Sequence, residues 1–285
     1  MQKFNILFMG LGRMGFPMAG HLSKKKNIDL YVYNRTKSKE NYWLKTFKGT
    51  SYSLAKDLKF DYIITCLKDD QSLKNVLKEI LKYQNFNKNT VLVDHSTISL
   101  DLVYLIQNLF KNKLSFLDSP VTGGEEGAKN GKLSVMVGGN IASFNKAKLI
   151  ISAYSKNITH MGKLGNGQLT KFTNQILICG ILYSISEALK FGKKNDINLN
   201  KLYNAIKNGA AGSWQFSNRF PTILKNKFNF GFSTELMAKD LKYVLKQSDK
   251  NQINLKLTKE VYLKYKKLSN SRYKKSDTSS LIKTF

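Results

Sequence analysis

Three glycines near the start of the sequence have the spacing G-x-G-x-x-G, in the segment from Gly10 to Gly15. They follow a short apolar run at residues 4–10 and precede a segment typical of a helix. In that context the first glycine permits a tight turn, the second lets a pyrophosphate approach the backbone, and the third allows close helix–strand packing. The free N–H groups of the helix N-terminus would face the phosphates. The motif predicts a dinucleotide-binding turn with contacts from Gly10, Leu11, Gly12, Arg13, Met14 and Gly15.

The segment after the next expected strand, residues 29–34, indicates which dinucleotide is bound. A carboxylate about 20 residues after the glycines would hold the ribose hydroxyl of NAD. Here no acid occurs from residue 34 to residue 39. Arg35 could instead clamp the 2′-phosphate of NADP, with Asn34 and Thr36 beside it. We therefore predict that NADP is the preferred cofactor and that NAD is possible.

Lys171 differs from most lysines of this chain because its immediate neighbours in GNGQLTKFTNQIL, residues 165–177, carry no charge. Hydride reduction of a carbonyl leaves an oxyanion that must be protonated, so the reaction needs a positioned acid. Partial desolvation of an amine lowers its pKa and eases proton exchange. Asn174 lies three residues further on the same expected helix and could hold a substrate. We interpret Lys171 as a general acid and base; the alternative is an ordinary surface lysine.

A second candidate binding element follows Pro120, where Thr122, Gly123 and Gly124 end an expected strand. Successive backbone N–H groups with little side-chain obstruction suit a carboxylate. The same glycine pair is equally compatible with a plain turn. The residues alone leave these two readings open.

Alternating strands and helices should position these candidate cofactor- and substrate-binding residues. Apolar segments predict strands at residues 4–10, 29–34, 62–67, 90–96, 114–120, 132–139 and 157–162. Helical segments separate most of them, which favours a mostly parallel, doubly wound sheet. From about residue 167 to residue 194 the pattern changes to one long apolar helix, followed by amphipathic helices. We predict an α/β protein, with a Rossmann-type dinucleotide-binding domain at residues 1–163 and an all-helical substrate and oligomerisation domain at residues 164–285.

The composition argues against several other classes of protein. The 285 residues carry a formal net charge of +28, but the lysines are spread along the chain and arginines are few. A nucleic-acid surface concentrates its cations and uses arginine for bidentate contacts, so we predict no nucleic-acid partner. The three histidines and two cysteines show no metal or disulfide spacing, so we expect no metal and a reducing, cytoplasmic location. No apolar run approaches the roughly 20 residues needed to span a membrane, and the N-terminal run lacks a signal-peptide cleavage site.

With these residues in place, the sequence resembles the β-hydroxyacid dehydrogenases over essentially its whole length. The matching motifs are FMGLGRMGFPMA, DSPVTGGEEGAKNGKLSVMVGG, GNGQLTKFTNQIL, GAAGSWQF, KDL at residues 239–241 and DTSSLIK. The resemblance implies a Rossmann-type domain, a helical domain and an active site in the cleft between them. It also implies a small carboxylate-bearing substrate and a homodimer or homotetramer.

The resemblance also assigns individual residues. Lys171 corresponds to the catalytic lysine. The residues that correspond to substrate-binding positions are Thr122, Gly123, Gly124, Asn174, Gln175 and Asp240. Further cofactor-binding positions correspond to Leu67, Lys68, Thr97, Phe232 and Lys239. The family usually has serine at the position of Thr122 and often proline at that of Lys68, so the pocket could be narrower here and the Lys68 contact differs.

The expected activity is hydride transfer between NAD(P) and a small β-hydroxyacid or its semialdehyde, of the 3-hydroxyisobutyrate dehydrogenase or semialdehyde reductase type. The alternative is a non-catalytic relative that uses the fold for binding or assembly, but such a scaffold has no reason to keep Lys171. Imine reductases of related sequence typically replace that lysine, which argues against imine reduction. Trp214 could line the cleft or serve only as a core residue, and core is the default for a lone tryptophan. His95 is interpreted as structural.

Overall fold

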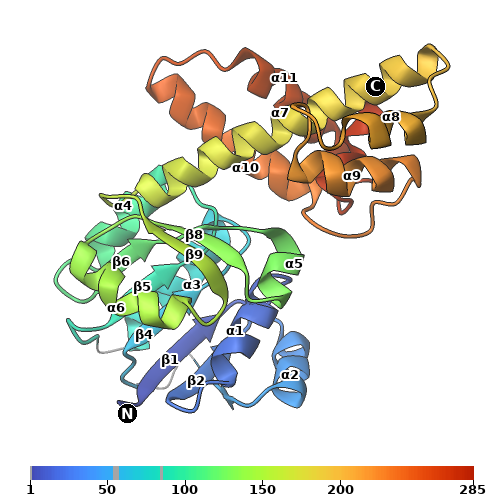
Figure 1. The fold of residues 1–285 in the computed structure, drawn as a ribbon. Helices are drawn as coiled ribbons and strands as arrows, with labels where there is room; N and C mark the ends of the chain where they lie inside the picture. Colours follow the sequence, from blue (N-terminus) through green and yellow to red (C-terminus); the bar gives the residue numbers. More distant parts are fainter. Residues whose placement is uncertain (1, 54–57, 84–85) are drawn as a thin grey trace. The chain divides into compact units, whose positions relative to one another are not determined.

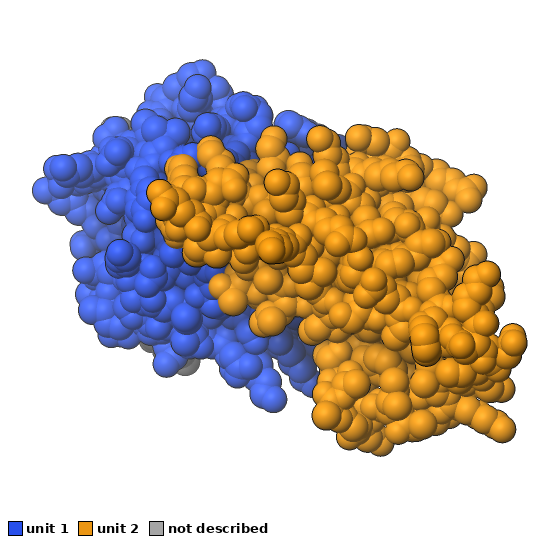
Figure 2. All heavy atoms as spheres, turned by 90° about the horizontal axis from the view of Figure 1, so that it is seen from above, with its two compact units in different colours: residues 1–171 blue, residues 172–285 orange. Residues whose placement is uncertain are grey.

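The computed structural model of the protein describes residues 2–53, 58–83 and 86–285 (Figure 1). The chain forms two compact units, residues 1–171 and residues 172–285, which are coloured separately in Figure 2. The point of division lies inside helix α7 (Asn166–Lys194). The predicted domain boundary at residues 163/164 stays a prediction.

The first unit contains a six-stranded parallel sheet in the order β3-β2-β1-β4-β5-β6. Its strands are β1 (Phe4–Met9), β2 (Ile28–Tyr33), β3 (Thr50–Ser51), β4 (Tyr62–Thr65), β5 (Val91–Asp94) and β6 (Ser115–Asp118). Strands β4 and β5 are buried along their whole length, which explains their continuous apolar sequences. The strand order reverses between β1 and β4, and ligands of such sheets bind outside the carboxyl ends of the strands at this point.

Helices cover this sheet, as Figure 1 shows. They are α1 (Gly15–Ser23), α2 (Lys37–Thr46), α3 (Asp70–Tyr83), α4 (Leu100–Leu109) and α6 (Ile141–Ile151). The core between sheet and helices includes Phe8, Met18 and Trp43, all fully buried. The Rossmann-type fold class is therefore confirmed.

The last two strands expected from the sequence do not belong to this six-stranded sheet, contrary to the prediction of one doubly wound sheet. They are β8 (Leu133–Val137) and β9 (Ser155–His160), which form a separate three-stranded sheet with β7 (Val121–Thr122). Helix α5 (Gly124–Lys129) lies between β7 and β8 in the chain. Pro120 has no N–H to donate to a ladder, and after it β7 pairs antiparallel with β8 instead of continuing β6. Sheet membership depends on such long-range pairing, which the strand patterns did not reveal.

The second unit is helical, as predicted. After α7 come α8 (Leu199–Ile206), α9 (Trp214–Leu224), α10 (Thr234–Lys250), α11 (Lys256–Ser269) and a closing 3₁₀ helix, η1 (Thr278–Thr284). Asn198 and Ser213 accept hydrogen bonds from the first turns of α8 and α9, which satisfies donors that a helix start leaves open. The chain end packs against this unit, since Leu281 is fully buried and Tyr265 donates its hydroxyl proton to the Thr278 carbonyl.

Helix α7 corrects one expectation. Its 29 residues include an 18-residue window with a mean hydropathy of 1.2, which is long and apolar enough to cross a membrane by length and composition alone. Polar side chains such as Asn174 and Gln175 interrupt the apolar sequence of this helix. The mean hydropathy of the 18-residue window is nevertheless 1.2. Core helices of soluble proteins meet the same criterion, so this is weak evidence for a membrane span.

Candidate active site

The glycine-rich turn has the geometry that a dinucleotide requires. Gly10 directly follows β1 and has a φ of +104°, a conformation that favours glycine. A Cβ atom on Gly15 would collide with the Gly10 carbonyl oxygen, so α1 can approach the strand only with glycine there. A Cβ atom on Gly12 would meet nothing within 4 Å, so the backbone at that position faces open space. The turn therefore fits a cofactor pyrophosphate at Gly12.

Asn34 connects this turn to the end of β2. Its side-chain oxygen accepts a hydrogen bond of 3.0 Å from the Leu11 N–H, and its own N–H donates to Glu40 Oε2 at 2.8 Å. Glu40 is completely buried and also binds Lys37 and Ser51 through Oε1. Arg35 and Thr36 are exposed at the same strand end.

Glu40 was not predicted as a site residue because it lies one residue beyond the segment 34–39, which contains no acid. Each of its carboxylate oxygens is already bonded within the protein. Glu40 therefore orders the loop that carries Arg35.

A cavity of about 610 Å³ opens beside the turn. Residues of the turn, of α1 and its neighbours, and of α2 line it together with two residues of α5: Leu11, Gly12, Arg13, Phe16, Pro17, Gly20, His21, Lys24, Ser38, Lys39, Tyr42, Phe47, Glu125 and Lys129. The cavity therefore includes three of the predicted cofactor contacts and adjoins the α2 segment that follows Thr36.

A buried hydrogen-bond network ties together the carboxyl ends of β4 and β5. The Leu67 N–H donates to Ser96 Oγ at 2.8 Å, and Ser96 Oγ–H donates to Asp94 Oδ1 at 2.6 Å. Thr65 also donates its hydroxyl proton to that oxygen, at 2.6 Å. The predicted cofactor residues Leu67, Lys68 and Thr97 thus lie in two loops that this network joins. Asp94 was not recognised in the sequence, and one of its partners, Thr65, comes from another strand.

The predicted carboxylate loop lies where β7 ends and α5 begins. Gly123 and Gly124 both have positive φ angles, +123° and +65°, so the chain turns there in a way that favours glycine. A Cβ atom on Gly124 would meet nothing within 4 Å. The loop backbone is therefore accessible, as a carboxylate-binding turn requires.

Lys171 lies in the second turn of α7, and its side chain is only 8% exposed. Two side chains anchor the first turn of this helix. Asp118, at the end of β6, accepts hydrogen bonds from the Gly165 and Gln168 N–H groups, at 2.8 and 2.7 Å. Gln168 donates to the Ser96 carbonyl and accepts from the Ile98 N–H. The helix that carries Lys171 is thus fixed to the carboxyl ends of β5 and β6.

The environment of Asp118 opposes its ionisation. Burial raises the pKa of this carboxyl to about 7, although the hydrogen bonds from Gly165 and Gln168 act in the opposite direction. Asp118 was not among the residues predicted to be functional. Its place in the DSP segment at a strand end was the available signal.

His95 is structural, in agreement with its interpretation from the sequence. Its Nδ1 lies 2.6 Å from the Ser119 carbonyl oxygen and its Nε2 lies 2.7 Å from the Tyr154 hydroxyl. Burial lowers the pKa of the imidazole to about 4. Both nitrogens are occupied by protein groups, so the ring is a neutral part of the core.

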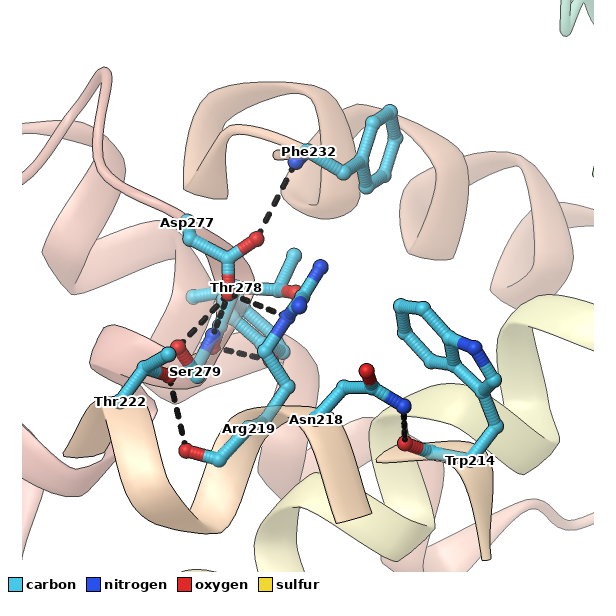
Figure 3. A network of polar contacts seen from close by, with 9 residues as sticks. Trp214, Asn218, Arg219, Thr222, Phe232, Asp277, Thr278 and Ser279 are labelled. Carbon is cyan, nitrogen blue, oxygen red and sulfur yellow. Dashed lines mark hydrogen bonds and ion pairs between the residues drawn. The ribbon is translucent and has the colours of Figure 1, made fainter. Parts of the chain in front are cut away.

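In the second unit the structure brings four predicted residues into one chain of contacts. Asn174 Nδ2 donates to Gln175 Oε1 at 2.9 Å, and Gln175 Nε2 donates to Asp240 Oδ2 at 2.7 Å. The Lys239 ammonium lies 3.1 Å from Asp240 Oδ1. Asp240 is buried, and the nearby Lys239 ammonium balances the charge of its carboxylate. Phe232 lies outside this chain of contacts, and its N–H donates to Asp277 Oδ2 at 3.2 Å (Figure 3).

Trp214 is not a core residue, contrary to the interpretation from the sequence. It is the first residue of α9, and its side chain is 54% exposed. The default for a lone tryptophan fails here because the ring packs against an arginine side chain instead of the apolar core. Within residues 2–53, 58–83 and 86–285, no group of three or more His, Cys, Asp and Glu side chains could hold a metal ion.

Comparison of the sequence with known protein families identifies the family of this chain. A profile for the NAD binding domain of 6-phosphogluconate dehydrogenase matches residues 5–162. A profile for the NAD-binding of NADP-dependent 3-hydroxyisobutyrate dehydrogenase matches residues 165–285. An uncharacterized oxidoreductase of Shewanella frigidimarina is 39% identical over 281 residues, covering 97% of this chain and 96% of that protein. The 2-hydroxy-3-oxopropionate reductase of Escherichia coli is 32% identical, with 87% and 85% covered.

The fold is also shared with solved structures. A 3-hydroxyisobutyrate dehydrogenase of Mycobacterium tuberculosis, determined with L-serine, superposes with a TM-score of 0.87 at 23% identity and covers 99% of both chains. At this identity the likeness concerns the fold, and the family assignment comes from the profiles and the closer relatives. The protein therefore belongs to the β-hydroxyacid dehydrogenase family, and it is an NAD(P)-dependent oxidoreductase that acts on CH–OH donors.

Proposed function

We propose that the protein interconverts a small β-hydroxyacid and its semialdehyde, with Lys171 as the general acid in reduction and the general base in oxidation. The observation that carries this proposal is the burial of Lys171 in the second turn of a helix whose start is anchored to two strand ends. Burying an ammonium group costs free energy, so a lysine at a buried, rigid position calls for a specific reason. Proton transfer to a substrate is such a reason.

The chemistry needs one proton for each hydride. When bound, the nicotinamide cofactor supplies the hydride in reduction and accepts it in oxidation. As the C=O bond becomes a C–O single bond, Lys171 Nζ gives its proton to the oxygen. In the reverse direction the neutral amine takes the proton from the hydroxyl group. A group at the end of a flexible but buried stem can do both, provided that the helix backbone does not move.

NADP is the proposed cofactor, in preference to NAD. Arg35 and Thr36 lie exposed at the end of β2, and the nearby acid Glu40 is buried and bonded to Asn34, Lys37 and Ser51. A guanidinium group attracts a 2′-phosphate, whereas the ribose hydroxyl of NAD is usually bound by a free carboxylate. Leu67, Lys68, Thr97, Phe232 and Lys239 are proposed as further cofactor contacts, as the family resemblance implies.

The substrate carboxylate is proposed to bind the backbone of Thr122, Gly123 and Gly124, where the loop is open. Asn174, Gln175 and Asp240 are proposed as the remaining substrate-binding residues. Relatives of the chain include proteins named 3-hydroxyisobutyrate dehydrogenase, 2-hydroxy-3-oxopropionate reductase and L-serine dehydrogenase. The substrates in these names share a carboxylate and an oxidisable hydroxyl group or its carbonyl counterpart on a short carbon skeleton.

We also propose that the protein acts in the cytoplasm as a homodimer or homotetramer. Leu177 and Phe191 on α7 are large apolar side chains that are 61% and 69% exposed. A second copy of the chain would cover them.

A direct test is a panel of small semialdehydes and β-hydroxyacids, each assayed with NADPH, NADH, NADP and NAD by absorbance of the reduced nicotinamide. The proposal expects turnover of at least one semialdehyde with NADPH and oxidation of the matching hydroxyacid. Cofactor binding without turnover of any member, by a protein that also reduces no imine, would favour the non-catalytic alternative.

A further inference from the structure

Helix α1 and the short helix α5 are in contact within the first unit (Figure 1). Helix α1 begins at Gly15, where the dinucleotide turn ends, and α5 begins at Gly124, the last residue of the proposed carboxylate loop. The cavity beside the turn is lined by residues of α1 and by Glu125 and Lys129 of α5. A side chain that joins these two helices therefore connects the proposed cofactor site with the proposed substrate site.

His21 is the side chain that joins them. Its Nε2 lies 3.0 Å from the carbonyl oxygens of both Ala128 and Lys129, in the last turn of α5. A carbonyl oxygen can only accept a hydrogen bond, so Nε2 carries a proton and donates to both. The last four carbonyls of a helix have no partner within that helix. His21 thus supplies, from α1, a donor that the end of α5 requires.

The end of α5 also packs closely against the imidazole. Gly131 has a φ of +64°, and its N–H donates to the Ala128 carbonyl at 3.3 Å. The Lys132 N–H donates to the Gly127 carbonyl at 2.8 Å, which completes a Schellman motif at this helix end. A Cβ atom on Gly131 would lie 3.3 Å from His21 Cε1, so the ring contacts the glycine backbone directly.

The other end of α5 is the proposed carboxylate loop. The helix contains six residues, so its two ends are only about 9 Å apart. The Gly127 N–H donates to the Gly123 carbonyl at 3.0 Å, and the Gly127 carbonyl accepts from Lys132. One residue thus links the proposed carboxylate loop to the helix end that His21 holds.

We infer that His21 is a positioning residue that couples the two proposed binding sites, because it ties the carboxylate loop to the helix that starts at the dinucleotide turn. This inference rests on the proposed function, which assigns Gly123 and Gly124 to the substrate. A pyrophosphate bound at the turn restricts the motion of α1, and the bond from His21 passes this restriction to α5. The loop is then better ordered for a carboxylate. By linkage, a carboxylate on the loop raises the affinity for the cofactor by the same factor.

Hydrogen exchange of the intact protein tests this coupling without turnover. NADPH should slow the exchange of backbone amides in residues 123–132 of the unaltered protein by about three- to tenfold, the effect expected from one or two hydrogen bonds. His21→Leu removes the donor and should lose this slowing, although NADPH still binds. His21→Gln should retain it, because the glutamine amide can donate to both carbonyls. Absence of slowing in the unaltered protein, or full slowing in His21→Leu, would overturn the inference.

His160→Leu is a matched control for the loss of a histidine. His160 Nε2 also lies 2.8 Å from a carbonyl oxygen, that of Gly139, but His160 belongs to β9 and to neither proposed binding site. This variant should keep the slowing by NADPH. The urea midpoint of each variant shows whether it is folded. Loss of the NADPH effect in both leucine variants would assign it to general destabilisation and would overturn the inference.

Steady-state kinetics provide a second readout. A carboxylate that is held equally in the ground state and the transition state contributes to KM and not to kcat. His21→Leu should therefore raise the KM for the β-hydroxyacid that the unaltered protein oxidises by about three- to tenfold, with kcat nearly unchanged. His21→Gln should restore most of this loss, and an unchanged KM in His21→Leu would contradict the coupling. If the unaltered protein turns over no substrate, the proposed function fails, while the exchange experiment still reports whether His21 couples α1 to α5.

Discussion

The carboxylate of Asp118 and the N–H of Gln168 form a 2.7 Å hydrogen bond between the end of β6 and the first turn of α7. Lys171 follows three residues later on this helix. The side chain of Gln168 in turn binds the Ser96 carbonyl after β5. The position of the proposed general acid is therefore set by strand ends of the same sheet that carries the dinucleotide turn.

Asp118→Asn should destabilise the first unit by about 1–3 kcal/mol. An asparagine offers one acceptor oxygen, whereas the Gly165 and Gln168 N–H groups occupy both oxygens of the carboxylate. One buried donor would be left unsatisfied. Urea unfolding at pH 7.5 measures the loss, and activity should fall as well because Lys171 loses its anchor. Wild-type stability in this variant would show that the two bonds are dispensable.

The pH dependence of unfolding should contain two opposing contributions, from Asp118 and His95. Burial raises the pKa of Asp118 from 3.8 to about 7, so the folded state binds the extra proton and this contribution to stability declines as pH rises from about 4 to 7. Burial lowers the pKa of His95 from 6.5 to about 4, so the unfolded state binds the extra proton and stability declines as pH falls from about 6.5 to 4.

Substituting either Asp118 or His95 should therefore reveal the pH dependence of stability that the other residue contributes. His95→Gln should lose stability with rising pH between 4.5 and 7 more steeply than the unaltered protein, by up to about 3 kcal/mol over the range. Asp118→Asn should show the opposite slope below pH 6.5. Urea midpoints at four pH values between 4.5 and 7.5 provide the measurement. Parallel pH profiles for both variants and the unaltered protein would contradict the two shifts.

Arg35→Asp should invert or abolish the preference for NADPH. A charge-assisted bond to a phosphate contributes about 1.5–3 kcal/mol, so the ratio of KM values for NADPH and NADH should change by at least tenfold. Arg272→Asp, at an exposed arginine of the second unit, controls for the change in net charge. Equal or better use of NADH by the unaltered protein would remove the basis for this prediction.

The apolar surface of α7 should hold copies of the chain together. Light scattering at micromolar concentration should give at least twice the 32.5 kDa of one chain. Substituting Leu177 and Phe191 by lysine should shift the mass toward the monomer, whereas Leu149→Lys, at an exposed leucine of α6, should not. A clean monomer for the unaltered protein would refute the proposed assembly.

The features predicted correctly from the sequence are local ones. The dinucleotide turn is recognisable because Gly10, Gly12 and Gly15 act through their spacing alone, and α10 is recognisable from its apolar period. Asp94 and Asp118 could not be assigned in this way. The donors to Asp118 lie 47 and 50 residues further along the chain, and Thr65 lies 29 residues before Asp94. A carboxylate whose partners are so distant looks like a surface acid until the strands are placed side by side.

Lys171→Ala should lower kcat by at least about two orders of magnitude, the usual scale for a general acid. Binding of NADPH should be retained, because the dinucleotide turn lies in another part of the first unit and does not contain Lys171. Lys190→Ala is a matched control, since Lys190 lies on the same helix and is exposed. Single-turnover kinetics at saturating NADPH separate the chemical step from binding.

Chemical rescue makes this test specific for proton transfer. A small primary amine added to Lys171→Ala should restore part of kcat in proportion to its concentration, because it can occupy the space of the missing side chain and supply the proton. The same amine should not affect Lys190→Ala or the unaltered protein. A merely structural role would give loss of activity without rescue and a lowered unfolding midpoint. Near-full turnover of Lys171→Ala would show that Lys171 is an ordinary buried lysine and that another group protonates the substrate oxygen.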